Sequence, residues 1–287
     1  EKEIQYMINI KRSGLVDFGQ TIIMGILNAT PDSFFAESRC NDNREEILRK
    51  ASQMINDGAK IIDIGGYSSR PGAKEVSENE ELDRVCKAVS IVRDEFKDVI
   101  ISVDTFRSKV AKESVLSCGA DIINDISAGE FDKDMIETVA KLKVPYIIMH
   151  SKGSNISEQQ KSYEYQNFLD EIFKFFANKI DECHKRGIAD VILDPGFGFS
   201  KSMEENYKLL AHLDEFKNFE DSPLLVGVSR KRMAWQVAET TIENSLNATT
   251  SLHTLALSKG LPLILRVHDV KEAMEIVKIT EMYNKCK

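Results

Sequence analysis

Short runs of hydrophobic, often β-branched residues recur along the chain, and each is followed by a longer segment in which hydrophobic residues repeat with helical spacing. This alternation is typical of a parallel sheet whose strands are joined by helices. The runs are apolar on both faces, as strands covered on both sides must be. We expect eight such strands, at 22–27, 60–64, 99–103, 121–123, 145–149, 191–193, 224–228 and 263–267.

Segments with helical spacing fill the intervals between these strands. Glycine lies just past four of them, at Gly58, Gly119, Gly187 and Gly260, and it is favoured where a helix ends because it adopts a positive φ. Eight successive strand–helix units predict a (β/α)₈ TIM barrel, and a doubly wound open sheet is the alternative. We expect the helices at 44–57, 78–96, 108–117, 134–141, 163–186, 204–211, 242–259 and 270–283.

The residues before the first unit alternate between apolar and polar around Gly14. This pattern predicts a β-hairpin within 1–20 that closes the floor of the barrel. No linker or low-complexity tract interrupts the remaining units. We therefore expect 1–287 to form a single domain, since barrels of this type commonly have about 250 residues or more.

The composition is that of an ordinary globular protein, and the formal charge of −8 argues against a broad surface for binding nucleic acid. The five cysteines are scattered without a CxxC pair, so neither a zinc site nor a disulfide framework is expected. A reducing compartment fits this pattern best. No apolar run is long enough for a membrane span, and the charged start is unlike a secretion signal. We expect a cytoplasmic protein.

Polar or charged side chains follow every predicted strand. In a barrel, the carboxyl ends of the strands meet on one rim, where enzymes of this fold carry their active sites. Strand ends are commonly polar, but that rule alone does not predict a ring of acids, amides and bases. The ring comprises Asn28, Asp63, Asp104, Asn124, His150, Asp194, Ser229, Arg230, Lys231, Arg266 and His268.

Asp104 and Asp194 follow apolar runs on different strands, so both should be partly buried and need hydrogen-bond donors. The 2-amino-pyrimidinone edge of a pterin offers adjacent N–H groups that suit a carboxylate. Asn124 could donate and accept beside it, and Lys231 could serve the acceptors of the ring. For Asp104 the alternative is an N-cap of the helix that begins near Ser108.

Basic residues gather after the last two strands. Arg266 and His268 lie two positions apart and therefore on one face while the strand continues. The loops after strands seven and eight are the usual phosphate site of such barrels, so we expect an anion there. For Arg266 the alternative is an ion pair with Asp269 or another acid.

The loops that begin at Asn28 and Gly65 are longer than a simple connection requires and have the character of lids over a substrate. Asn28 offers an uncharged oxygen ligand that suits a Mg²⁺ ion bridging to phosphate. Arg70, in the second loop, would add a positive charge. Both residues could instead cap turns.

Seven segments of the chain resemble the signature segments of the dihydropteroate synthases, in the same order. The resemblance extends from about Met24 to Val270, which is nearly the whole predicted barrel. The segments are MGILNATPDSF, GAKIIDIGGYSSRPGA, ISVDTFRSKVA with GADIINDISAG, VPYIIMH, ILDPGFGFSK, LLVGVSRK and ILRVHDV.

The resemblance implies the condensation of 6-hydroxymethyl-7,8-dihydropterin diphosphate with p-aminobenzoate, with Mg²⁺ present and diphosphate released. It assigns the pterin to Asp104, Asn124, Asp194 and Lys231 and the metal to Asn28. It assigns the diphosphate to Arg266, Val267 and His268, and the arylamine side to Ser69, Arg70, Pro71 and Phe199. It also implies a homodimer and a target of sulfonamides, although the sequence does not fix the sensitivity to these drugs. It further implies catalysis by Asp104, Lys231, Arg266 and His268 without a covalent nucleophile.

The sequence departs from the common pattern at three positions. Tyr67 replaces glutamate, Ser69 replaces threonine, and Arg232 replaces a serine near the arylamine end. Arg232 could bind the carboxylate of p-aminobenzoate, narrow the pocket or point to solvent, and we favour solvent. Two other functions remain open: a pterin-binding methyltransferase of the folate–corrinoid type, which handles no diphosphate, and a catalytically silent paralogue that binds pterin.

Overall fold

A computed structural model of the chain describes residues 6–30, 40–68 and 75–287. Eight parallel strands form a closed barrel in the order β10-β3-β4-β5-β6-β7-β8-β9. This confirms the predicted TIM barrel and excludes the open sheet. The strands are β3 (Ile22–Asn28), β4 (Ile61–Gly65), β5 (Ile100–Asp104), β6 (Ile122–Asp125), β7 (Tyr146–Met149), β8 (Val191–Asp194), β9 (Leu224–Val226) and β10 (Leu263–Val267).

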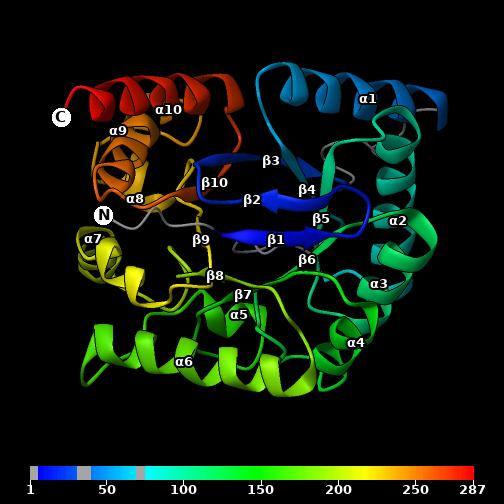
Figure 1. Ribbon diagram of the computed structural model, residues 1–287, viewed down its shortest axis with the longest axis horizontal. Coiled ribbons are helices and arrows are strands. Elements are labelled where there is room, and N and C mark those ends of the chain that lie inside the picture. The colour runs from blue at the N-terminus through cyan, green and yellow to red at the C-terminus, as the bar shows by residue number, and fades with distance from the viewer. Residues whose placement is uncertain (1–5, 31–39, 69–74) are drawn as a thin grey trace.

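Helices surround the barrel, and the longest ones run along its outside (Figure 1). Each predicted helix has a counterpart, although two begin later than expected. The segment predicted from 163 begins at Phe168, because Asn167 before it is extended, and the segment predicted from 242 begins at Leu246. The helices are α1 (Cys40–Asn56), α2 (Glu78–Glu95), α3 (Ser108–Glu113), α4 (Met135–Leu142), α5 (Ile156–Gln159), α6 (Phe168–Arg186), α7 (Met203–Ala211), α8 (Arg232–Trp235), α9 (Leu246–Leu257) and α10 (Val270–Lys285), with a π-helical turn η2 (Ser114–Cys118) and a 3₁₀ turn η3 (Leu213–Asn218).

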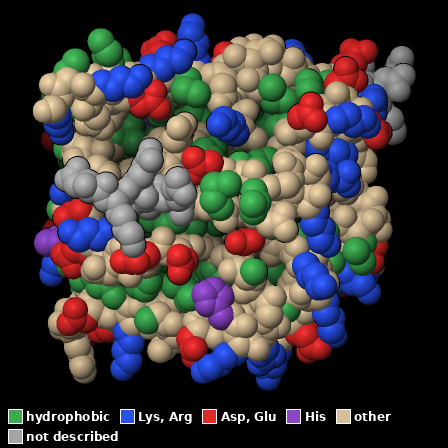
Figure 2. All heavy atoms as spheres, in the orientation of Figure 1, with side chains coloured by type: hydrophobic (Ala, Val, Ile, Leu, Met, Phe, Trp, Pro, Cys, Tyr) green, Lys and Arg blue, Asp and Glu red, His purple; other side chains and the backbone are tan. Residues whose placement is uncertain are grey.

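The predicted N-terminal hairpin is confirmed. Strands β1 (Met7–Ile10) and β2 (Gly14–Asp17) pair antiparallel, and the turn between them uses Gly14 at φ +74°. The hairpin lies across the end of the barrel that faces the viewer in Figure 1, and the buried side chains of Ile8 and Ile10 pack on the barrel interior. On the same face, acidic and basic side chains are interspersed rather than segregated (Figure 2).

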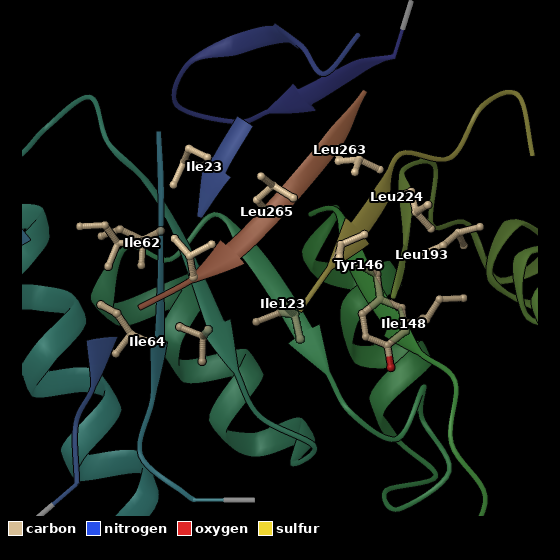
Figure 3. Packing of buried hydrophobic residues seen from close by; sticks show 14 of the residues in the cluster. Ile23, Ile62, Ile64, Ile123, Tyr146, Ile148, Leu193, Leu224, Leu263 and Leu265 are labelled. Atoms are coloured by element: carbon tan, nitrogen blue, oxygen red, sulfur yellow. The ribbon is translucent and has the colours of Figure 1, made fainter. Parts of the chain in front are cut away.

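Side chains alternate along each strand between the barrel interior and the helices. The interior floor is a layer of large aliphatic side chains that packs with the hairpin: Ile22, Met24, Ile61, Ile100, Ile122, Ile147, Ile192, Leu225 and Ile264. The outward residues, such as Ile23, Ile64 and Ile148, pack against the helices (Figure 3). A residue that lies two or four positions after a floor residue on the same strand therefore points into the barrel at its carboxyl rim.

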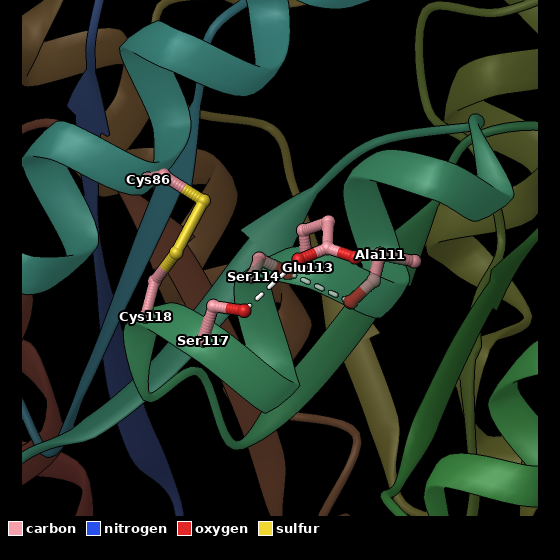
Figure 4. The surroundings of a disulfide bond; sticks show 6 residues. All are labelled: Cys86, Ala111, Glu113, Ser114, Ser117 and Cys118. Carbon is pink, nitrogen blue, oxygen red and sulfur yellow. Dashed lines mark hydrogen bonds between the residues drawn. A yellow bond between two sulfur atoms is a disulfide. The ribbon is translucent and has the colours of Figure 1, made fainter.

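A disulfide joins Cys86 on α2 to Cys118 at the end of η2, with a Cα–Cα distance of 5.4 Å (Figure 4). This corrects the expectation that no cysteines pair. Because 32 residues separate the two cysteines, their proximity depends on the packing of α2 against η2. Among the described helices, none is long and apolar enough to cross a membrane.

Candidate active site

An arginine between two carboxylates occupies the interior of the rim. Arg266 on β10 donates through Nε to Asp63 Oδ2 at 2.7 Å, and its Nη2 lies 3.4 Å from Asp104 Oδ2. Floor residues Ile264, Ile61 and Ile100 fix the inward direction of these three side chains, which lie two or four positions further along their strands. The alternative that Arg266 pairs with an acid is therefore realised, but the acids are Asp63 and Asp104 rather than Asp269.

Asn124 on β6 belongs to the same group. Its Nδ2 donates to Asp63 Oδ2 at 3.2 Å. Asp63 and Asn124 are buried, whereas Asp104 keeps 21% of its side chain exposed at the rim. Asp104 is thus the carboxylate of this group that is open to a ligand from above.

The pKa of Asp104 is raised to about 7. Burial is the largest cause, and the negative charge of Asp63 adds to it, while Arg266 opposes both. Asp104 is not the N-cap of α3, since the backbone N–H of Ser108 binds Asp132 instead, at 2.7 Å. The cap alternative is therefore wrong, and the carboxylate of Asp104 points into the barrel.

Asp194 and Lys231 form the other side of the cavity. Asp194 points inward from β8 and accepts a hydrogen bond from the backbone N–H of Gly196 at 2.9 Å. Lys231 Nζ donates to Phe197 O at 2.5 Å and lies 4.9 Å from the centre of the Phe199 ring. Burial lowers the pKa of Lys231 to about 8, although Asp194 and Asp104 act to raise it. The predicted pterin residues Asp104, Asn124, Asp194 and Lys231 are thus brought to one rim.

A buried lysine that sequence reasoning missed holds the loop after β8. Lys201 Nζ donates to the carbonyl oxygens of His150, Gly196 and Phe199 at 3.2, 3.0 and 3.1 Å. Burial lowers its pKa to about 7. Gly196 and Gly198 both have positive φ in this loop, which turns several carbonyl groups toward one point. The signal available in the sequence was a lysine directly after a glycine-rich run.

The basic residues after β9 and β10 divide into two groups. Ser229 Oγ lies 2.9 Å from His268 Nδ1 and accepts a hydrogen bond from the backbone N–H of His268 at 3.1 Å. Arg230 makes a two-point ion pair with Asp269 and binds the carbonyl oxygens of 242 and 243. Arg230 is therefore committed to a structural contact, while Arg266 and His268 face the rim. Val267 is fully buried and faces the helices, so only its backbone could meet a ligand in the barrel.

Asn28 ends β3 on the inward side and is half-buried. Asn28 and His268 line a pocket of about 550 Å³ between β3, α1 and the start of α10. In the described part of the chain, no three His, Cys, Asp or Glu side chains gather into a metal site. A Mg²⁺ ion that keeps most of its waters and binds phosphate needs only one or two protein ligands, so Asn28 fits this role.

The residues at the predicted arylamine side are only partly described. Phe199 lies beside Lys231, whereas Ser69, Arg70 and Pro71 fall outside the described residues. Arg232 is exposed and its Nη2 donates to Gln236, the residue directly after α8, so Arg232 points to solvent as we expected. Tyr67 packs edge-on against Phe106 at 5.5 Å.

His150 does not belong to the inward ring. It follows Met149, which is the last inward position of β7, and its ring is buried against Phe175 and Tyr165 on the helix side. Burial lowers its pKa well below the usual value, so the ring is neutral. The prediction that His150 faces the rim is wrong, because one step along a strand reverses the direction of the side chain.

A second buried network, also missed from the sequence, ties the β4–α2 connection to β5. Arg107 donates to Glu81 Oε2 at 2.7 Å and to Val76 O at 2.8 Å. Thr105 donates to the other oxygen of Glu81 at 2.7 Å. Thr105 and Arg107 come just after Asp104, so the network fixes the backbone at the end of β5.

The model of one protein family, described as pterin binding enzyme, matches residues 24–268. The dihydropteroate synthase of Escherichia coli strain K12 is 41% identical over 268 residues, which cover 93% of both chains. The dihydropteroate synthase of Clostridium beijerinckii is 36% identical over 265 residues, covering 92% of this chain and 94% of the relative.

Solved structures are similar over the whole barrel. The Yersinia pestis dihydropteroate synthase in a sulfonamide drug complex has a TM-score of 0.87 and 41% identity, and the match covers 98% of this chain and 99% of that one. The Xanthomonas albilineans dihydropteroate synthase with 4-aminobenzoic acid has a TM-score of 0.87 and 30% identity, covering 98% of both chains.

Proposed function

The chain belongs to the dihydropteroate synthases of the pterin-binding enzyme family, and we propose which part of the reaction each of its site residues serves. The enzyme is a transferase that condenses 6-hydroxymethyl-7,8-dihydropterin diphosphate with p-aminobenzoate to give 7,8-dihydropteroate and diphosphate. The observation that carries the assignment of residues is the convergence of Asp104, Asn124, Asp194 and Lys231 on one rim of the barrel.

The pterin lies between β5, β6 and β8 in this proposal. Asp194 accepts N–H groups from the 2-amino-pyrimidinone edge, and Asn124 donates and accepts beside it. Lys231 supplies a donor to the ring acceptors. Its position at 4.9 Å from the Phe199 ring also brings the pterin and the arylamine side next to each other.

The diphosphate lies at the ends of β10 and β3. Arg266 and His268 face this side, and the backbone at Val267 is available between them. Asn28 would hold Mg²⁺, which supplies positive charge to the diphosphate oxygens when bound. Asn28 and His268 lie at the carboxyl ends of the neighbouring strands β3 and β10, which supports a shared anion and metal site there.

The reaction forms a bond between the amine nitrogen and the pterin methylene carbon while the carbon–oxygen bond to diphosphate breaks. The electron pair of that bond leaves on the diphosphate oxygen, where Arg266 and His268 stabilise the charge. Asp104 offsets positive charge on the pterin methylene, and after attack the amine nitrogen releases one proton to solvent water. Ser69, Arg70, Pro71 and Phe199 would line the arylamine side. No side chain acts as a covalent nucleophile, because the amine nitrogen attacks the methylene carbon directly.

Diphosphate release from the pterin diphosphate, measured with and without p-aminobenzoate, tests this function. We expect release that depends on the amine. Tight pterin binding without release would favour the silent paralogue, and methyl transfer from a reduced folate without use of the diphosphate would favour the methyltransferase.

We also propose that two copies form a homodimer through α7, α8 and α9. Val237 and Leu255 expose large apolar side chains and line a pocket of about 400 Å³ between these helices, and Ile242, shortly before α9 in the sequence, is also exposed. Sulfonamides are expected to compete with p-aminobenzoate, as the sulfonamide drug complex of the Yersinia pestis relative suggests. A cytoplasmic location remains our proposal.

A further inference from the structure

We propose that Asp63 is a positioning residue that holds Arg266 and Asn124 in the orientation required for the pterin diphosphate, without contacting the substrate itself. This inference rests on the proposed roles of Arg266 and Asn124.

One oxygen of Asp63 connects distant parts of the barrel. Oδ2 accepts from Arg266 Nε at 2.7 Å and from Asn124 Nδ2 at 3.2 Å. Arg266 lies on β10, two strands to one side of β4, and Asn124 lies on β6, two strands to the other side. A single buried oxygen therefore fixes side chains across five neighbouring strands, one on the diphosphate side and one on the pterin side.

The two acids beside Arg266 differ in their access to a ligand. The side chain of Asp63 is fully buried, and its contact with Arg266 is short. Asp104 is 21% exposed and its contact with Arg266 is longer, at 3.4 Å. Asp104 can therefore exchange Arg266 for a substrate while Asp63 keeps the guanidinium in place.

Ser102 provides a matched control at the same level of the barrel. It is the register partner of Asp63 on β5 and its side chain is also buried on the inner side. Ser102 Oγ and Asp63 Oδ1 have no hydrogen-bond partner among the described residues. Replacing Ser102 thus alters the polarity of the same layer without touching Arg266 or Asn124.

The charge of Asp63 also acts on Asp104. The groups that face Asp104 are Asp63 on β4, Arg266 on β10, Glu81 on α2, Asp125 on β6 and Lys231 before α8. After burial, Asp63 is the largest cause that raises the pKa of Asp104. Asp104 acts as a carboxylate, so activity increases as pH rises through its pKa, and this rise is the acid limb of the pH–rate profile. Removing the charge of Asp63 lowers the pKa of Asp104 and therefore moves the acid limb to lower pH. A change in packing alone would lower the rate without moving the limb.

The experiment compares Asp63→Asn with Ser102→Ala in the full chain. The dissociation constant of the pterin diphosphate is measured by calorimetry, and the kinetic constants of both substrates are measured across pH. We expect Asp63→Asn to lower kcat/KM for the pterin diphosphate roughly 10- to 100-fold, the scale for a hydrogen bond to a charged group. We expect the KM of p-aminobenzoate to change less than about 3-fold, and Ser102→Ala to stay within about 2-fold of wild type.

The inference is overturned if folded Asp63→Asn binds the pterin diphosphate as tightly as the wild type and its acid limb does not move. It is also overturned if kcat/KM falls equally for both substrates. If Asp63→Asn does not fold, Asp63→Glu keeps the charge but displaces the carboxylate. It is then expected to weaken pterin diphosphate binding while the acid limb stays in place, and unchanged binding would overturn the inference. Absence of amine-dependent diphosphate release in the wild-type chain would instead contradict the proposed function.

Discussion

Among single residues, the direction of each side chain at the rim is set by its position along a strand. Asn28, Asp104, Asn124, Asp194 and Arg266 each lie an even number of positions beyond a floor residue, so all five point into the barrel. The same rule explains the wrong prediction for His150. The partner of Arg266 could not be predicted, because Asp63 is 203 residues away in sequence and the contact depends on closure of the barrel.

Asp104→Asn and Arg266→Ala are each expected to lower turnover by on the order of 100-fold or more, the scale for one preorganised charged group. Asp104→Asn removes the charge that offsets the pterin methylene, and Arg266→Ala removes a cation from the diphosphate. Steady-state kinetics check both, with circular dichroism to verify folding. Lys185→Ala is a suitable control because Lys185 is exposed and, within the described part of the chain, forms its ion pair with Asp181 on its own helix. Wild-type turnover in either site variant would contradict the assignment.

The dependence of activity on pH is expected to be bell-shaped and to come from Asp104 and Lys231. Asp104 acts as a carboxylate, and because its pKa is raised to about 7, activity increases as pH rises through that value. Lys231 acts as an ammonium, and because its pKa is lowered to about 8, activity decreases as pH rises further. A profile of kcat/KM for the pterin diphosphate checks both limbs. Lys231→Arg should remove the alkaline limb, and a limb that persists there would exclude Lys231 as its source.

At the scale of elements, Lys201 stabilises the loop between β8 and α7. Its ammonium satisfies three carbonyl oxygens, and the next residue, Ser202, caps α7 with a reciprocal capping box. Lys201→Met leaves these carbonyl groups without their donor, which costs about 1–3 kcal/mol for a buried unsatisfied group. We expect a lower free energy of unfolding in urea and a higher KM for p-aminobenzoate, because Phe199 lies in the same loop. An unchanged free energy of unfolding together with an unchanged KM would contradict this role of Lys201.

The disulfide is a second feature of element packing that spacing in the sequence could not predict. Cys86 and Cys118 approach each other only because α2 and η2 pack side by side. Closing a loop of this size is expected to stabilise the oxidised protein by about 3–4 kcal/mol in the loop-entropy account. Urea unfolding with and without reductant measures the difference, and peptide mapping without reductant identifies the bond. Cys86→Ser should abolish the difference, and a difference that survives in this variant would have another origin.

At the scale of the whole molecule, the order of elements was predictable because each strand and helix carries its own period of hydrophobic residues. The eight strands, the helices between them and the hairpin over Ile8 and Ile10 all follow from that local signal. The contacts between elements that meet only when the barrel closes could not be predicted from the sequence. The networks of Asp63, Lys201 and Arg107 are of this kind, since each joins residues from at least two separate loops or strands.

The proposed homodimer would cover apolar side chains that the single chain leaves exposed to water. Burying Leu255 and Val237 against a second copy would remove from water two large apolar side chains that are now more than half exposed. Light scattering should give about 65 kDa, twice the chain mass of 32.4 kDa. Leu255→Glu should shift the protein toward the monomer because it would place a charge in an apolar interface. Leu116→Glu is the matched control, since Leu116 is 62% exposed on η2, away from α7, α8 and α9. A wild-type monomer at micromolar concentration, or equal effects of the two variants, would contradict the proposed interface.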